Sequence, residues 1–413
     1  MKLTEYLKTG KTYIIAEMSG NHDGSLEKAL QIVRAAAEAG ADCLKIQTYT
    51  ADTITIDAHT DPFLLKNGLW DKQYLYDLYK KAYTPWEWTA AIKEETERFG
   101  MDFLSTPFDA TAVDFLEGLG EEFYKIASFE LVDIPLIRKA ASTGKPLVIS
   151  CGMGSEDEIR EALETAQGAG SSTVVLLKCC SAYPTDYETM HLRTIPDMIQ
   201  KFGVPIGLSD HSEGTTAAVC AVSLGAQVIE KHLCLNKEEE TVDSAFSLDP
   251  AEFAKLVQDV RNAEKALGGI SYGPDEREAQ SYSLRRSLFA VADIHKGEPF
   301  TEENVRSIRP SGGLHTRYLT ELTAGKRPRE TSRSARRCPG RTWSESGRHH
   351  SRGREQPDRR RPPHAVPHNR ESVAGAGADL PLCGRVRHAG ERAGADPRRG
   401  LRAGDPGRGT RRP

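Results

Sequence analysis

Eight short runs rich in β-forming residues, each followed by a stretch of helical character, are the feature that most constrains the fold of this chain. The runs cover residues 13–18, 43–49, 102–108, 124–128, 147–152, 174–179, 206–211 and 228–233. Between them, apolar residues recur at helical spacing, as Leu26, Leu30 and Val33 do after the first run. Residues 84–87 and 249–252 each place a capping residue, a proline and a glutamate in the order that starts a helix.

Eight such units within about 250 residues predict an α/β protein with the (β/α)8 architecture of a TIM barrel. The alternative is a doubly wound open sheet, but that fold is marked by a GxGxxG turn after its first strand, and no such turn follows residue 18 here.

The rhythm ends after a helical stretch near residues 252–267, and the composition then changes twice. We predict a barrel domain over residues 1–270, a linker over 271–284, a small separate domain over 285–326 and a tail over 327–413. The tail has 22 Arg, no Lys and nine acidic residues, and it lacks Ile, Phe and Tyr. Such a segment buries too little apolar surface to offset its ordering entropy, so we expect it to be disordered.

Charge and hydropathy limit the partners of the chain. The overall net charge of -4 divides into about +13 in the tail and about -17 in the rest. An acidic body argues against nucleic acid as the main partner, which only the Arg-rich tail could bind. No apolar run approaches the roughly 18 residues of a membrane span, the first residues lack a signal-peptide pattern, and the cysteines are scattered. We therefore expect a cytoplasmic protein that does not bind a membrane.

Polar residues close the apolar runs, at the end where a TIM barrel carries its active site. Buried polar groups are costly unless they are paired or used, so eight such ends together predict a site. In chain order the residues are Glu17, Asn21, His22, Lys45, Gln47, Ser105, Thr106, Lys125, Ser128, Ser150, Lys178, Tyr183, Ser209, Asp210, His211, Glu230 and His232.

Two groups within this set have a chemical and a structural interpretation. His211 and His232 end neighbouring runs, where they could bind a transition metal such as Mn²⁺ or serve as ordinary structural residues. Lys45 and Lys125, among several serines, could hold a phosphate or simply pair with Glu17, Asp210 or Glu230. The adjacent cysteines at 179–180 we interpret as core packing.

From about Thr12 to Leu319 the chain closely resembles the sialic acid synthase family of phosphoenolpyruvate-dependent nonulosonate synthases. The motifs that carry the resemblance are IAEMSGNHDGS, LKIQTYT, FLSTPFD, YKIASFE, ISCGMG, SAYPT, GLSDHS and EKHL, then RRSLFAV and VRSIRP. The resemblance implies that the small domain is an antifreeze-like (SAF) domain. It also implies a transferase that condenses phosphoenolpyruvate with an N-acetylated amino sugar and releases phosphate by C–O cleavage.

The resemblance assigns roles to matching positions. It implies that His211 and His232 bind a divalent metal, typically Mn²⁺, and that Glu17 handles the proton of a water or of a sugar hydroxyl. It implies a phosphoenolpyruvate site made of Lys45, Thr106, Lys125, Ser128, Ser150 and Ser209, and a sugar site made of Glu17, Gln47, Tyr183, Asp243 and Arg309. Arg309 matches an arginine that reaches the barrel of a neighbouring subunit, which implies a domain-swapped homodimer.

Within the family, the segments LWDKQYLYDLYKKAYTPWEW and DSAFSLDP resemble the pseudaminic acid branch. That branch uses 2,4-diacetamido-2,4,6-trideoxy-L-altrose as its acceptor. The alternatives are an N-acetylneuraminate or legionaminate synthase, or a metal-dependent pyruvate aldolase that releases no phosphate. Where the family usually has Gly-Gly-Pro before Asp243, this chain has residues 240–242 as Glu-Thr-Val.

The family also continues differently after Arg327, with a pattern like A-R-D-L-x-x-G-T-P-L. Codons compatible with residues 329–343 can be read in another frame as such an ending, and GC-rich DNA read off-frame overproduces Arg, Pro, Gly and Ala. We therefore predict that the tail is an out-of-frame translation and that the SAF domain is truncated.

Overall fold

The computed structural model describes residues 2–334 and residue 338. The chain divides into two compact units, residues 1–273 and 274–413.

The first unit is a closed barrel in which every neighbouring pair of strands is parallel, in the order β1-β2-β3-β4-β5-β6-β7-β8. The predicted TIM barrel is therefore confirmed, and the open-sheet alternative is wrong. The strands are β1 (Tyr13–Glu17), β2 (Cys43–Thr48), β3 (Asp102–Pro107), β4 (Tyr124–Ile126), β5 (Leu147–Ser150), β6 (Val174–Cys179), β7 (Ile206–Asp210) and β8 (Val228–His232).

Seven of the eight strands end one or two residues before the predicted runs do. At β4, for example, Ser128 begins a 3-10 turn instead of extending the strand. Most of the predicted site residues lie at the last positions of a strand or directly after it.

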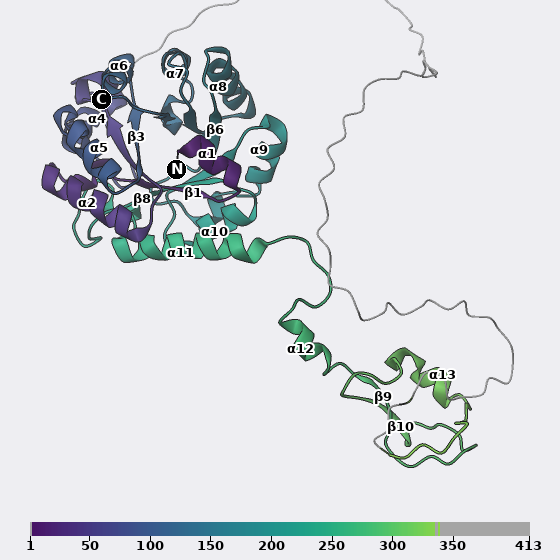
Figure 1. The fold of residues 1–413 in the computed structure, drawn as a ribbon. Coiled ribbons are helices and arrows are strands. Elements are labelled where there is room, and N and C mark those ends of the chain that lie inside the picture. Colours follow the sequence, from purple (N-terminus) through teal and green to yellow (C-terminus); the bar gives the residue numbers. More distant parts are fainter. Residues whose placement is uncertain (1, 335–337, 339–413) are drawn as a thin grey trace, which may run out of the picture. The chain divides into compact units, whose positions relative to one another are not determined.

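Helices follow the strands and surround the barrel (Figure 1). Ser25 caps the first of them, and Asp249 and Glu252 form the predicted capping box of the last. The covering helices are α2 (Leu26–Ala39), α5 (Thr89–Arg98), α6 (Ala110–Gly118), α7 (Ile134–Ala141), α8 (Glu156–Gly168), α9 (Thr194–Phe202), α10 (Thr216–Ser223) and α11 (Pro250–Leu267), with α1 (Leu3–Tyr6), α3 (Ala51–Ile54) and α4 (Leu75–Ala82) as shorter additions.

The predicted cap at residues 84–87 is wrong, although helical structure does begin within this segment. Residues 86–88 form a 3-10 turn without a side-chain cap, and α5 begins at Thr89. The Thr84 hydroxyl lies instead 3.2 Å from Nε2 of the buried His22, so a tertiary contact replaces the local one.

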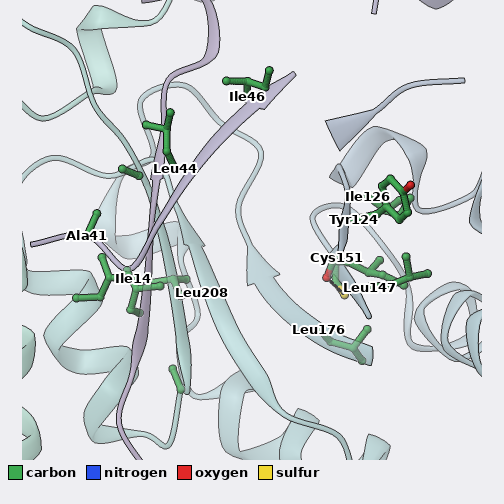
Figure 2. Close-up of a cluster of buried hydrophobic side chains, with 14 of the residues drawn as sticks. Ile14, Ala41, Leu44, Ile46, Tyr124, Ile126, Leu147, Cys151, Leu176 and Leu208 are labelled. Atoms are coloured by element: carbon green, nitrogen blue, oxygen red, sulfur yellow. Dashed lines mark hydrogen bonds between the residues drawn. The ribbon is translucent and has the colours of Figure 1, made fainter. Parts of the chain in front are cut away.

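Two apolar layers hold the barrel together. One lies between strands and helices and includes Ile14, Leu44, Ile126 and Leu208 (Figure 2). The other lies inside the barrel, where Tyr13, Ile15, Cys43, Leu104, Val148, Val175, Leu177 and Val228 pack with Leu3 of α1. Side chains alternate between the two faces of a strand, so the residues two places after many of these interior apolar groups also face inward. These are polar residues, such as Glu17, Lys45 and Ser150.

The second unit is built on an antiparallel pair, β9 (Ser287–Ala290) and β10 (Val305–Ile308), with α13 (Leu319–Thr323) beside it and α12 (Glu278–Tyr282) in the exposed segment that precedes it. Its core includes Leu288, Ile294, Phe300, Val305 and Leu322. Chain beyond residue 326 joins this core, because Ser332 pairs with Ile294 and the backbone N–H of Cys338 donates to Leu288. The rest of the Arg-rich tail, for which we predict disorder, lies outside the described residues.

None of the helices within residues 2–334 is both long and apolar enough to cross a membrane.

Candidate active site

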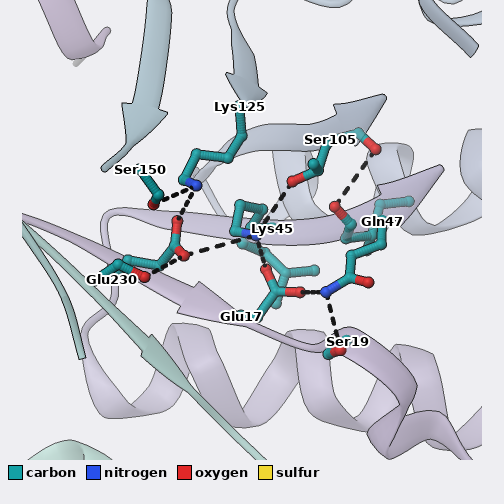
Figure 3. A network of polar contacts seen from close by, with 12 residues as sticks. Glu17, Ser19, Lys45, Gln47, Ser105, Lys125, Ser150 and Glu230 are labelled. Carbon is teal, nitrogen blue, oxygen red and sulfur yellow. Dashed lines mark hydrogen bonds and ion pairs between the residues drawn. The ribbon is translucent and has the colours of Figure 1, made fainter. Parts of the chain in front are cut away.

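A connected polar network fills the barrel at the carboxyl ends of its strands (Figure 3). Lys45 Nζ lies 2.5 Å from Glu17 Oε2 and 3.2 Å from the Thr106 hydroxyl. The Gln47 amide donates to Glu17 Oε1 and to the Ser19 hydroxyl, both at 3.0 Å. These contacts join β1, β2 and β3 around one carboxylate.

The other side of the network centres on Glu230 of β8. Its carboxylate accepts a hydrogen bond of 3.0 Å from the Ser209 hydroxyl and lies 3.9 Å from Lys125 Nζ and 3.8 Å from Lys45 Nζ. Lys125 also donates to the Ser150 hydroxyl at 2.6 Å. The structure therefore brings together the lysines and serines that the sequence predicts to lie close, and each lysine faces a glutamate.

Burial sets the electrostatics of this network, because its two lysines and two glutamates are each at most 5% exposed. Burial, reinforced by the neighbouring Glu230, raises the pKa of Glu17. Burial also disfavours ionised Glu230, but Lys125 and Lys45 outweigh it and hold the pKa of that carboxyl below its usual value. Burial likewise lowers the pKa of Lys125. The pKa values of two similar carboxyls, Glu17 and Glu230, are thus shifted in opposite directions. Active sites use such shifts to separate a proton acceptor from a group that stays charged.

The histidines predicted to form a pair do lie together, with ring centroids 5.3 Å apart. His211 Nδ1 lies 3.2 Å from the carbonyl oxygen of Cys180, whereas His232 Nδ1 is buried and has no hydrogen-bond partner. In the described part of the chain, no group of three or more His, Cys, Asp or Glu side chains is arranged to hold a metal ion. The candidate metal ligands at this position are therefore two imidazoles, and the buried Nδ1 of His232 is available to a metal ion.

Our interpretation of residues 179–180 as core packing missed a contact with this pair. Cys179 Sγ lies 3.8 Å from His211 Nδ1. Burial raises the pKa of the thiol, but the His211 contact outweighs it and brings that pKa to about 7. Parity could have indicated the contact, since residue 179 shares its face of β6 with the interior residues Val175 and Leu177.

A buried ion pair joins the ends of β7 and β8, next to the two histidines. The sequence analysis included one partner, Asp210, but not the other, Lys231. Asp210 and Lys231 are register partners on β7 and β8, each precedes one of the two histidines, and their charged atoms lie 3.0 Å apart. Asp210 Oδ1 also accepts from the backbone N–H and hydroxyl of Ser212, at 2.9 and 2.6 Å. The alternative in which Asp210 pairs with Lys45 or Lys125 is therefore wrong, because its side chain points to the other face of β7.

Aromatic rings stand beside the histidines. The ring of Tyr183 lies 4.5 Å from that of His211 and 5.2 Å from that of Phe246, and the ring of Trp70 lies 5.5 Å from that of Tyr183. We call Trp70, Tyr183 and Phe246 the aromatic wall. Only Tyr183 is in the predicted site.

The remaining predicted residues take different places. Ser128 accepts a hydrogen bond of 3.0 Å from the backbone N–H of Gly152, in the loop after β5. Asp243 is buried, its Oδ2 lies 3.5 Å from the backbone N–H of Gly20, and burial raises its pKa. Lys178 turns toward its own backbone and donates to the carbonyl of Cys179. Arg309 belongs to the second unit, where it is exposed.

A parallel barrel with buried lysines, hydroxyls, opposed carboxyls and paired imidazoles at its carboxyl end has the construction of a (β/α)8-barrel enzyme. Residues 32–272 match the NeuB family, and residues 285–331 match the SAF domain. The chain belongs to the NeuB family.

Its relatives include enzymes named as synthases. It is 46% identical to the pseudaminic acid synthase of Campylobacter jejuni over 79% of this chain and 95% of that protein. It is 34% identical to the N,N'-diacetyllegionaminic acid synthase of Legionella pneumophila over 76% of this chain and 90% of that protein. The crystal structure of the N-acetylneuraminic acid synthetase of Leptospira borgpetersenii superposes with a TM-score of 0.59 at 31% identity, covering 66% of this chain and 90% of that one.

Proposed function

We propose that this enzyme condenses phosphoenolpyruvate with 2,4-diacetamido-2,4,6-trideoxy-L-altrose to give pseudaminic acid and phosphate. The observation that carries the proposal is the buried network of two lysines, hydroxyls and opposed carboxyls at the strand ends. The higher identity to a pseudaminic acid synthase than to a legionaminic acid synthase supports the choice of sugar.

Phosphoenolpyruvate would be held by Lys45, Thr106, Lys125, Ser128, Ser150 and Ser209. The two lysines are buried, and hydroxyls lie within hydrogen-bond distance of both ammonium groups. A phosphate or carboxylate placed between them would accept charge-assisted hydrogen bonds from groups that are already oriented. The lysines would then exchange their glutamate partners for the substrate's oxygens.

His211 and His232 fit a divalent metal, for which Mn²⁺ is our proposal, because the partnerless buried Nδ1 of His232 is costly without a ligand. When bound, such an ion would polarise the aldehyde oxygen of the open-chain sugar as a Lewis acid.

The reaction needs a proton acceptor and a group that stabilises the departing phosphate. C3 of phosphoenolpyruvate attacks the aldehyde carbon, water adds at C2, and phosphate leaves by cleavage of its C–O bond. Glu17, whose pKa is raised by burial, would accept the proton of that water or of a sugar hydroxyl. Lys125 would stabilise the phosphate as it departs.

The sugar would lie toward the open end of the barrel, in contact with Glu17, Gln47, Tyr183 and Asp243. Arg309, exposed on the second unit, would reach the sugar site of a partner subunit in a domain-swapped homodimer. A cytoplasmic location, where phosphoenolpyruvate is made, also belongs to this proposal.

A direct assay tests it. The purified chain is incubated with phosphoenolpyruvate, Mn²⁺ and one of three acceptors, namely the altrose derivative or the acceptor of an N-acetylneuraminate or a legionaminate synthase. Phosphate is measured together with the nonulosonate product. We expect phosphate release only with a sugar, and fastest with the altrose derivative. A faster reaction with another acceptor would move the chain to another branch, and condensation of pyruvate without phosphate would make it an aldolase.

A further inference from the structure

The aromatic wall continues outward from the paired imidazoles. The rings run from His232 to His211, then to Tyr183 and Trp70, with successive centroids 5.3, 4.5 and 5.5 Å apart. Phe246 contacts all four rings, with centroids 4.8 Å from His232, 5.8 Å from His211, 5.2 Å from Tyr183 and 6.4 Å from Trp70. The inner end of this row is the metal candidate, and the outer end is an indole.

Trp70 reaches this place from a long insertion after β2. The chain there forms a hairpin, in which Leu64 bridges to Tyr74 and Leu65 exchanges backbone hydrogen bonds with residues 72–73. Trp70 lies at its tip and is half-buried, so part of the indole can face a ligand.

A polar contact fixes the orientation of the indole. Its Nε1–H donates to the carbonyl oxygen of Val242 at 3.1 Å, in the loop that precedes Asp243. The same loop is held from the other side, where the Thr241 hydroxyl donates to Asn21 at 2.6 Å. Trp70 therefore joins the insertion to the segment that carries Asp243.

Another part of the site is polar. The Gln47 amide contacts Glu17 and Ser19, and Asp243 lies near the backbone of Gly20. A sugar in contact with these groups and with the wall would find most of its hydrogen-bond partners among Glu17, Gln47 and Asp243. At the outer end of the wall the sugar would face Trp70 and Phe246, whose rings offer it no hydrogen bond because the indole N–H is already used, whereas Tyr183 keeps its hydroxyl.

We propose that Trp70 is a specificity-determining residue, and that the aromatic wall selects an acceptor with a methyl group, not a hydroxymethyl group, at C6. This inference rests on the proposed function, which places the aldehyde carbon C1 at the imidazole pair. In an extended open-chain sugar C6 is the far end, so it lies toward Trp70. A methyl group there is buried against apolar surface, whereas a hydroxyl loses its water without gaining a partner.

The test compares two acceptors that differ in one oxygen, the 2,4,6-trideoxy sugar and its 6-hydroxy counterpart. We expect the enzyme to prefer the 6-deoxy sugar in kcat/KM by about tenfold to a hundredfold, the usual limit for rejecting an added hydroxyl by an apolar pocket. Trp70→Ala should reduce the preference to within about threefold while the KM for phosphoenolpyruvate stays the same.

Two conservative variants separate the ring from its hydrogen bond. Trp70→Phe keeps an aromatic face but frees the Val242 loop, so it should keep the preference and raise the KM for both sugars. Trp86 is the matched control, since its indole is also half-buried and donates to a backbone carbonyl, that of Tyr49, but packs on Phe115 away from the wall. Trp86→Phe should leave both quantities unchanged. An unchanged preference in Trp70→Ala would overturn the inference.

A binding measurement distinguishes this inference from the proposed function. In saturation-transfer NMR with irradiation of the protein's aromatic protons, the C6 methyl signal of the sugar should be enhanced, and Trp70→Ala should lose that enhancement. Methyl enhancement without turnover would reject the proposed reaction and keep the binding surface. Turnover without methyl enhancement would keep the reaction and reject the role of Trp70.

Discussion

Replacing Lys231 with methionine should destabilise the barrel far more than any exposed lysine replacement. The Lys231 ammonium and the Asp210 carboxylate are both fully buried, 3.0 Å apart, and Lys231 also donates to the carbonyl of Ser212. Methionine has a similar length and no charge, so Lys231→Met fills the space but leaves Asp210 as a buried carboxylate without a cation. Breaking a buried pair in this way typically costs about 3–5 kcal/mol.

The measurement is urea unfolding followed by tryptophan fluorescence, to which Trp70, Trp86 and Trp88 of the barrel unit contribute. The matched control is Lys255→Met, which breaks the exposed pair between Lys255 and Asp259, whose charged atoms lie 2.7 Å apart. Exposed pairs of this kind contribute about 1 kcal/mol or less, because water and salt screen them.

A double variant identifies the cause of the loss. Adding Asp210→Asn to Lys231→Met removes the stranded charge while leaving an oxygen to accept from Ser212, so it should recover most of the lost stability. If Lys231→Met costs no more than Lys255→Met, or if the double variant is worse than the single one, the stranded charge is not the cause.

Four further predictions concern the site, its surroundings and the tail. Lys125→Ala should raise the KM for phosphoenolpyruvate roughly ten- to a hundredfold, because a charge-assisted contact worth about 1.5–3 kcal/mol is lost; an effect confined to the sugar would remove Lys125 from the phosphate site. His232→Ala should weaken Mn²⁺ binding in calorimetry by about tenfold or more, while His59→Ala, at an exposed histidine, should not; equal affinities would reject the metal site. Burial lowers the pKa of His22 to about 4. Between pH 6.5 and 4 this histidine is therefore protonated in the unfolded chain but stays mostly neutral in the folded chain. Stability should therefore fall by roughly 3 kcal/mol more over that range in the parent chain than in His22→Gln, and identical pH profiles would contradict this. Sequencing the gene around the Arg327 codon should show a shifted frame, and mass spectrometry of the natural protein that finds the present tail would refute it.

Local patterns in the sequence were enough to predict the barrel and most of the polar side of its site. Eight alternating units determine the fold class, and alternation along each strand determines which side chains face inward. Apolar Ile15 and Val148 precede Glu17 and Ser150 on the same faces, so the lower interior is apolar and the upper interior is polar. These relations need only the period of a strand, which any one segment carries by itself.

Pairing between elements could not be predicted in this way. From the sequence, Asp210 could pair with any of several lysines. Its partner is Lys231, because the register of β7 against β8 places the two residues opposite each other. Cys179 contacts His211 for the same reason, since Cys179 ends β6 and His211 directly follows β7, 32 positions away. Thr84, which has the sequence signature of a cap, instead contacts His22.

Trp70 lies furthest beyond the reach of sequence reasoning. Its partners, Tyr183 and Val242, are more than 100 positions away and belong to other loops. Loop side chains follow no period, and nothing local tells an indole which surface it will meet. The sequence determined the barrel and the inward-facing chemistry, because alternation is a property of one strand. The ion pair behind the histidines and the wall beside them were decided by closure of the barrel, which brings distant segments together.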